Sequence, residues 1–180
     1  MNKESITRNL VITEFVSLDG VMENPAWTMP YWNDEIAAFK GAEDGDALLL
    51  GRVTYQGFAA AWPERTGDGA EYFNSVRKYV VSTTLDTLEW NNSTLIGANI
   101  VAEIARLKQQ DSQDIVVHGS ATLVQTLMQH DLVDHYRLLV YPVVLGNGKR
   151  LFQAGTTATL QLLESQAFSS GVVSLVYACL

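Results

Sequence analysis

The stretch from Ile115 to Phe152 constrains the fold more than any other part of this 180-residue chain. Its first three residues, Ile115–Val117, are all apolar and predict a strand buried on both faces. Apolar residues at helical spacing follow the turn His118-Gly119-Ser120, and a second long strand is predicted over 136–144. A strand, a helix and a returning strand form a βαβ unit. Such a unit implies a parallel sheet with helices on its faces.

The turn inside this unit is the first candidate binding site. Gly119 lets a ligand approach the backbone, Ser120 and Thr122 add hydroxyl donors, and a helix N-terminus favours negative charge. These features allow a phosphate or pyrophosphate to bind there. A second interpretation stays open at this point, in which Gly119-Ser120 is only a tight turn with a helix cap. The chain contains neither G-x-G-x-x-G nor G-x-x-x-x-G-K-[ST].

Two more predicted strands end in groups that bind anions. The strand predicted over 46–50 ends at Gly51-Arg52, just before a helix that contains Thr54, and a guanidinium group can grip a phosphate with a fork of donors. The strand predicted over 78–81 ends in the hydroxyl cluster 82–84. Two junctions of strand, glycine and helix in one sheet suit the two ends of a dinucleotide.

Two carboxylates are candidates for proton transfer. Asp19 follows the predicted first strand, 10–16, and is either a simple turn former or a ligand-facing group at the edge of the sheet. Glu35 lies in the first turn of a helix predicted from the cap Asn33 to about Ala42. If its face turns inward, burial raises the pKa of Glu35 towards the range useful for proton transfer. If the face turns outward, Glu35 only complements the helix dipole.

His118 is the third candidate, because imidazole titrates near neutrality. The sequence is equally compatible with His118 being a partly buried histidine that makes one hydrogen bond.

The loop 22–32 is rich in proline and aromatic residues, so we expect no regular structure there and a flap over a pocket or under a partner chain. The other predicted features are a short strand at 95–96, a helix over 98–110, a polar loop over 62–70 and a closing hairpin of 160–168 with 172–180.

Composition excludes several classes of protein. A net charge of −8 without a basic run argues against nucleic-acid binding. The chain has no apolar run of membrane-spanning length, and its N-terminus lacks the apolar core of a signal peptide. The single cysteine, Cys179, suits the cytoplasm, and the absence of a Cys/His cluster argues against a metal site. We therefore expect one cytoplasmic domain over 1–180, with its core at about 10–180.

Three segments in order, LLLGRVTYQGF, KYVVSTTL and VHGSATLVQTLMQHDLVDHYRLLVYPVVLGNGKRLF, resemble the dihydrofolate reductase superfold. The chain is most similar to the branch related to the C-terminal reductase domain of bacterial riboflavin biosynthesis, and the resemblance extends from Leu10 to Leu180. It implies an α/β fold, a three-layer αβα sandwich whose mostly parallel central sheet is closed by a C-terminal antiparallel hairpin.

The resemblance also implies that the cofactor is NADPH. Arg52 and Thr54 would hold the end with the 2′-phosphate, Ser82 and Thr83 would lie near the adenine ribose, and the glycine-rich turn would cradle the pyrophosphate. An arginine at the ribose phosphate favours NADPH over NADH. The implied cofactor-binding residues are Gly51, Arg52, Thr54, Ser82, Thr83, Gly119, Ser120, Ala121 and Thr122.

The function implied by the resemblance is NADPH-dependent reduction of a small heterocyclic, imine or carbonyl substrate, similar to a pterin or a riboflavin precursor. Glu35 is similar to the acid on the first helix of dihydrofolate reductases, and Asp19 would face the nicotinamide and the substrate. His118 stands where the riboflavin enzymes usually have an acidic residue. A homodimer is also implied. The alternative is a non-catalytic NADP(H)-binding or sensory homodimer that keeps the cofactor cradle without turnover.

Overall fold

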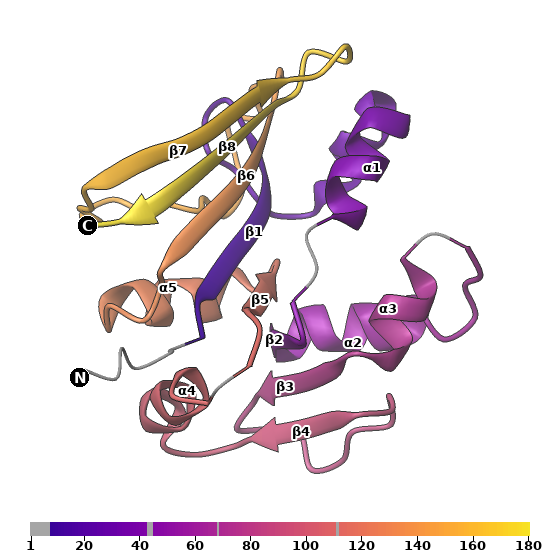
Figure 1. The fold of residues 1–180 in the computed structure, drawn as a ribbon, viewed down its shortest axis with the longest axis vertical. Coiled ribbons are helices and arrows are strands. Elements are labelled where there is room, and N and C mark those ends of the chain that lie inside the picture. Colours follow the sequence, from indigo (N-terminus) through magenta and orange to yellow (C-terminus); the bar gives the residue numbers. More distant parts are fainter. Residues whose placement is uncertain (1–7, 43–44, 68, 111) are drawn as a thin grey trace, which may run out of the picture.

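A computed structural model describes residues 8–42, 45–67, 69–110 and 112–180 (Figure 1). The elements, in chain order, are β1 (Leu10–Ser17), the 3-10 helix η1 (Pro25–Tyr31), α1 (Asp34–Gly41), β2 (Ala47–Gly51), α2 (Arg52–Ala61), α3 (Ala70–Ser75), β3 (Arg77–Val81), β4 (Ser93–Ile96), α4 (Ile100–Lys108), β5 (Ile115–His118), α5 (Ala121–Gln129), β6 (His135–Tyr141), β7 (Leu160–Ala167) and β8 (Val173–Cys179).

The described residues form an eight-stranded sheet in the order β4-β3-β2-β5-β1-β6-β8-β7. The first six strands in this order are parallel, whereas β8 pairs antiparallel with β6 and β7 pairs antiparallel with β8. The expected mostly parallel sheet with a C-terminal antiparallel hairpin is confirmed. Because β5 lies between β1 and β2, the strand from the βαβ unit occupies the middle of the sheet.

Helices cover both faces of this sheet, as expected for three layers (Figure 1). The helices α4 and α5 pack one face, where Ile104 and Leu127 join the largest cluster of buried side chains. The helices α2 and α3 pack the other face around Leu48, Leu50 and Val116. Strands buried on both sides need apolar residues at successive positions, which explains why the interior of β2 and β5 is a continuous apolar run.

Three details differ from the sequence-based expectation. The stretch 22–32 is not irregular throughout, since it contains η1; Pro25 fits the first turn of a helix, and Thr28 Oγ1 donates a hydrogen bond to the Pro25 carbonyl at 2.6 Å. The short helix α3 was not expected from the pattern. The strand predicted over 136–144 stops at Tyr141, because Pro142 has no N–H group for the sheet.

The helix η1 is held against the sheet by aromatic contacts. The rings of Trp27 and Tyr31 both pack edge-to-face on Tyr141, with centroids 5.4 and 5.9 Å away. No helix among the described residues is long and apolar enough to cross a membrane.

Candidate functional site

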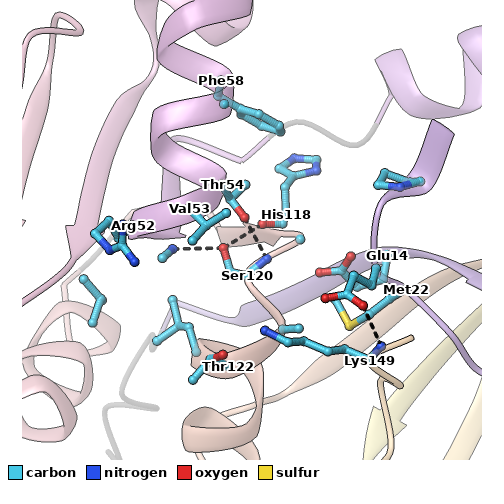
Figure 2. Close-up of a pocket in the computed structure, with 18 of the residues that line it drawn as sticks. Glu14, Met22, Arg52, Val53, Thr54, Phe58, His118, Ser120, Thr122 and Lys149 are labelled. Carbon is cyan, nitrogen blue, oxygen red and sulfur yellow. Dashed lines mark hydrogen bonds between the residues drawn. The ribbon is translucent and has the colours of Figure 1, made fainter. Parts of the chain in front are cut away.

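A cleft of about 900 Å³ lies at the carboxyl ends of the parallel strands. It opens where β5 separates β1 from β2, and Figure 2 shows α2 and the turn before α5 on one side with Glu14, Met22 and Lys149 on the other. Open α/β sheets bind ligands at this kind of position. The cleft is lined by 13–15, 22–25, Lys40, 51–54, 57–58, 81–84, Ile100, 118–123, Thr126 and Lys149.

Ser120 ties the two glycine junctions of the cleft together (Figure 2). Its hydroxyl accepts a hydrogen bond from the Gly51 N–H at 2.9 Å and donates one to the His118 carbonyl at 2.9 Å. Its own N–H donates to Thr54 Oγ1, also at 2.9 Å. The Ser120 side chain does not cap α5. Ser120 occupies the N-cap position of α5 without a side-chain cap hydrogen bond, and its hydroxyl proton, expected for a phosphate, is donated to the His118 carbonyl.

Gly119 is required at this turn for two reasons. Its backbone is left-handed, with φ +54°, and a Cβ atom there would lie 3.0 Å from Thr54 Oγ1. The close approach brings the N-termini of α2 and α5 to the same part of the cleft. Because neither helix has a side-chain cap, the N–H groups of their first turns are available for a ligand.

The distribution of acidic residues also favours an anion here. The helices α1, α3 and α4 each have an acidic residue in the first turn, whereas α2 and α5 have none. At the first position of α2 stands Arg52, exposed and hydrogen-bonded through Nη1 to Gln56 Oε1 at 3.3 Å. A cation at a helix N-terminus is unfavourable on its own. The N-termini of α2 and α5, which face the cleft, thus lack the acidic residues that would repel an anion.

The end of β3 is the third expected cofactor contact. Ser82 is buried, and its Oγ accepts hydrogen bonds from the N–H groups of Thr84 and Leu85 at 3.2 and 3.1 Å, so it shapes the turn. Thr83 is exposed, and both residues line the cleft. All nine expected cofactor residues lie around this one cleft.

Of the three expected catalytic residues, His118 lines the cleft and the other two do not. The imidazole is half-buried, with Phe58 and Phe73 at ring-centroid distances of 6.1 and 5.5 Å. Burial, assisted by the positive charge of Lys40, lowers the pKa of His118 well below its usual value. The ring is therefore uncharged at neutral pH.

Asp19 organises a loop outside the cleft. Its carboxylate accepts hydrogen bonds from the Ser17 hydroxyl at 2.6 Å and from the N–H groups of Leu145 and Gly146 at 3.1 and 2.8 Å. These donors hold the pKa of Asp19 well below its usual value, since they stabilise the charged form. The structure thus matches the turn-forming interpretation of Asp19.

Glu35 is exposed, so of the two alternatives the outward-facing one holds and burial does not raise the pKa of Glu35. Its carboxylate accepts hydrogen bonds from the Ser169 hydroxyl at 2.5 Å and the Ser169 N–H at 2.8 Å. These two bonds lower the pKa of Glu35. Glu35 joins α1 to the turn between β7 and β8 and does not line the cleft. The inward-facing residue of its helix is Ile36, which is fully buried.

Sequence reasoning missed Glu14, a buried carboxyl group in the cleft. Glu14 lies on β1 and is only 5% exposed. Burial raises the pKa of Glu14 well above its usual value, although Lys40 and a hydrogen bond from the Gly119 N–H oppose the shift. The available signal was a glutamate inside the mostly apolar strand β1.

Lys40 extends from α1 to the same end of the cleft. Its Nζ donates a hydrogen bond to Thr13 Oγ1 at 2.8 Å and lies 5.5 Å from the centroid of the Phe15 ring. Among the described residues, no group of three or more His, Cys, Asp or Glu side chains could hold a metal ion. The cleft therefore has an anion-friendly side at α2 and α5 and a side where Glu14, Lys40 and His118 come together.

Residues 8–174 match the family described as the RibD C-terminal domain. The chain belongs to this family. Two curated relatives from Bacillus subtilis (strain 168) are the uncharacterized proteins YyaP, 30% identical over 178 residues, and YwjB, 31% identical over 175 residues. The matches cover 94% of this chain and 94% of YyaP, and 92% of this chain and 95% of YwjB.

Solved structures share the fold of this RibD C-terminal domain. A putative riboflavin biosynthesis protein from Shewanella sp. PV-4 superposes with a TM-score of 0.75 at 19% identity, covering 96% of this chain and 99% of that one. A pyrimidine reductase-like protein from Corynebacterium diphtheriae gives a TM-score of 0.68 at 12% identity, covering 100% and 95%. The family confirms the relation expected from the sequence motifs and gives the chain a reductase-like fold.

Proposed function

We propose that this RibD C-terminal domain is an NADPH-dependent reductase of a small heterocyclic, imine or carbonyl substrate. The observation that supports the proposal most directly is the pair of helix N-termini at one end of the cleft. Both lack a side-chain cap and acidic residues in the first turn, and Arg52 stands at the first position of α2. In a chain with a net charge of −8, this end of the cleft is suited to a phosphorylated ligand.

The residues present fit a dinucleotide along the cleft. The open N–H groups of α5, at Ala121 and Thr122, would hold the pyrophosphate, while Arg52 would bind the 2′-phosphate and Thr83 would lie near the ribose. When bound, NADPH supplies a hydride to the substrate. The protein's part is to hold both molecules in line in a cleft of about 900 Å³, a volume in the range of small-molecule sites.

The substrate would occupy the other end of the cleft. There the apolar side chains of Phe15, Met22 and Phe58 line the space together with Glu14 and Lys40. Apolar walls with a few polar groups suit a flat ring that must be oriented by one or two hydrogen bonds. This chemistry supports a pterin-like or riboflavin-precursor-like substrate class.

A titration with NADPH and NADH, measured by calorimetry on the wild type and on Arg52→Gln, tests the proposal. A charge-assisted hydrogen bond contributes about 1.5–3 kcal/mol, so Arg52→Gln should weaken NADPH binding by roughly 10- to 100-fold. NADH binding should change less than about threefold, because NADH has no 2′-phosphate. Arg106→Gln is the matched control, since Arg106 is exposed and paired with Glu103 on α4. Equal losses for NADPH and NADH would refute the assignment of Arg52.

The rate of NADPH oxidation in the presence of pterin, flavin-precursor and quinone acceptors then distinguishes a reductase from a protein that binds NADPH without turnover. A non-catalytic NADP(H)-binding or sensory protein would bind NADPH tightly and oxidise it with none of these acceptors. Absence of binding to either nucleotide would contradict both functions.

We also propose that the protein works in the cytoplasm as a homodimer. The support is the outer strand β7, on which Leu162 and Leu163 are 51% and 53% exposed. Adjacent exposed leucines on an edge strand are unusual for a monomer, because such a strand pairs readily with another chain. Light scattering tests this, and Leu162→Lys should shift a dimer towards the monomer. A wild-type monomer would contradict the proposal.

A further inference from the structure

The cleft contains a buried carboxyl oxygen that has no hydrogen-bond partner. Within the part of the chain that the structure describes, Glu14 Oε1 is buried and makes no hydrogen bond, while the Gly119 N–H hydrogen-bonds to the same carboxyl group. Buried polar atoms are nearly always paired, and an unpaired one is destabilising. Because Glu14 also lines the cleft, a bound ligand is the natural partner for this oxygen.

The sheet opens where Glu14 is located. The pairing of β1 with β5 ends at Thr13 and His118, so Glu14 is the first residue of β1 beyond it. Its neighbour on the other side is Leu138 of β6, with which the pairing continues. The carboxyl group therefore lies where β1 and the turn at Gly119 diverge, next to the expected place of the cofactor. In Figure 2, Glu14 points into the space between the strands and Lys149.

The charged groups around Glu14 are few and differ in sign. Lys40 from α1 favours the carboxylate, and His118 at the end of β5 is uncharged. Glu23 and Lys149 also line the cleft, and Glu23 Oε2 accepts a hydrogen bond from the Lys149 N–H at 3.2 Å. Burial is the largest influence on Glu14, and it raises the pKa of the carboxyl group well above its usual value, which favours the protonated form.

We propose that Glu14 is the general acid of this cleft and donates its proton to the imine nitrogen or carbonyl oxygen of the substrate. This inference rests on the proposed reductase function. In the step, a reduced nicotinamide gives a hydride to the substrate carbon, and the electron pair of the C=N or C=O π bond takes the Glu14 proton. The products are the amine or alcohol, the oxidised nicotinamide and the Glu14 carboxylate. Solvent then reprotonates the carboxylate.

The position of Glu14 also narrows the substrate class. The reducible C=N or C=O group must lie within hydrogen-bond reach of Glu14 Oε1. A protonated carboxyl donates one hydrogen bond and accepts others, which matches a ring with a basic nitrogen next to an N–H group. The charge of Lys40 disfavours a cationic substrate. We infer a neutral or anionic conjugated heterocycle that is protonated only as it is reduced.

The first test measures the protonation of Glu14 directly. In protein labelled with ¹³C at the glutamate carboxyl, the resonance lost in Glu14→Gln identifies Glu14, and its chemical shift is followed from pH 5 to pH 9. We expect the shift of a protonated carboxyl at pH 7, both without nucleotide and with NADP⁺ bound. A carboxylate shift throughout this range would overturn the proposal, because the group would then have no proton to donate.

The second test measures the chemical step. Single-turnover oxidation of NADPH by 7,8-dihydropterin, an imine, should slow by at least about 100-fold in Glu14→Gln, which keeps the shape of the side chain and removes the acid. The dissociation constant for NADPH should change less than about threefold. Glu164→Gln is the control for loss of a carboxylate, since Glu164 is exposed on β7. The rate for the wild type should fall as pH rises through the pKa measured by NMR.

The outcomes separate the acid role from the reductase function. A wild type that binds NADPH but reduces neither 7,8-dihydropterin nor the other acceptors contradicts the proposed function and the acid role with it. An active wild type matched by an equally active Glu14→Gln contradicts the acid role alone. If Asp19→Asn or Glu35→Gln abolishes the rate and Glu14→Gln does not, the acid is the residue suggested by the sequence, and the proposal fails.

Discussion

The contact between Gly119 and Thr54 gives a quantitative test of how the cleft is built. In Gly119→Ala, the new Cβ atom would lie 3.0 Å from Thr54 Oγ1 and 3.4 Å from Thr54 Cγ2. Because a non-glycine residue in the left-handed region costs roughly 1–2 kcal/mol, the backbone alone predicts a loss of about that size. Displacing Thr54 Oγ1 also breaks its bond from the Ser120 N–H, at a further cost of about 1 kcal/mol.

Two comparisons isolate the part of this loss that comes from Thr54. Gly146→Ala has the same backbone penalty, since φ is +77°, but its Cβ would meet nothing within 4 Å. In a Thr54→Ala background both clashing atoms are removed and only Cβ, at 3.8 Å, remains. The Gly119→Ala substitution should therefore cost about 1 kcal/mol less there than in the wild type.

Urea unfolding followed by tryptophan fluorescence gives the free energy of unfolding of the four proteins in this cycle. Equal costs of Gly119→Ala in both backgrounds would refute the reasoning, since the Thr54 contact would then contribute nothing. The same variants report on the cleft, because a displaced Thr54 separates α2 from α5. NADPH binding should weaken in Gly119→Ala and not in Gly146→Ala.

Three other predictions follow from the charged groups. Lys40→Met removes the cation that lowers the pKa of His118, so the ¹H NMR titration of His118 should move upward; an unchanged or lower pKa would contradict this. Burial lowers the pKa of Lys78 from 10.5 to about 8. Between these two pH values the unfolded state therefore binds more protons than the folded state. The free energy of unfolding of the wild type, relative to that of Lys78→Met, should rise with pH in this window. A flat difference between the two unfolding free energies would count against burial as the cause. Asp19→Ala removes the acceptor of the Gly146 N–H, so hydrogen exchange at Gly146 should accelerate, and an unchanged exchange rate would show that the loop does not depend on Asp19.

The fold could be predicted from local patterns because the strongest ones lie in the middle of the sheet. The apolar run of β2 ends at Gly51 and that of β5 is followed by Gly119, and each pattern is typical of a buried strand that leads into a helix. The helix α3 was missed because six residues are too few for a helical period to appear. The helix η1 was missed because proline and aromatic residues have no helical spacing, and its position depends on Tyr141, which is distant in sequence.

The side of the cleft at α2 and α5 was easier to predict than the side around Glu14. Backbone geometry at strand ends places Arg52 and Gly119, and this geometry follows from the order of strand, glycine and helix. The environment of a carboxylate depends instead on distant elements. Glu14 lies in a mostly apolar strand, β1, and this pattern does not show what surrounds its carboxyl group, which is set by the turn after β5 and by Lys40 of α1. Glu35 is exposed because Ile36 turns inward.

The central place of β5 has a consequence for how the chain folds during synthesis. The strands β1 and β2 emerge from the ribosome early, but each pairs with β5, whose residues come 105 and 68 positions later, at Leu10↔Ile115 and Ala47↔Ile115. Until then the nascent chain has two apolar strands with open edges, which are sites for aggregation and for chaperones. Pairing over such separations is slow. Pulse labelling by hydrogen exchange should show the amides of β1, β2 and β5 becoming protected together, so the ligand cleft and the centre of the sheet would close in one late event.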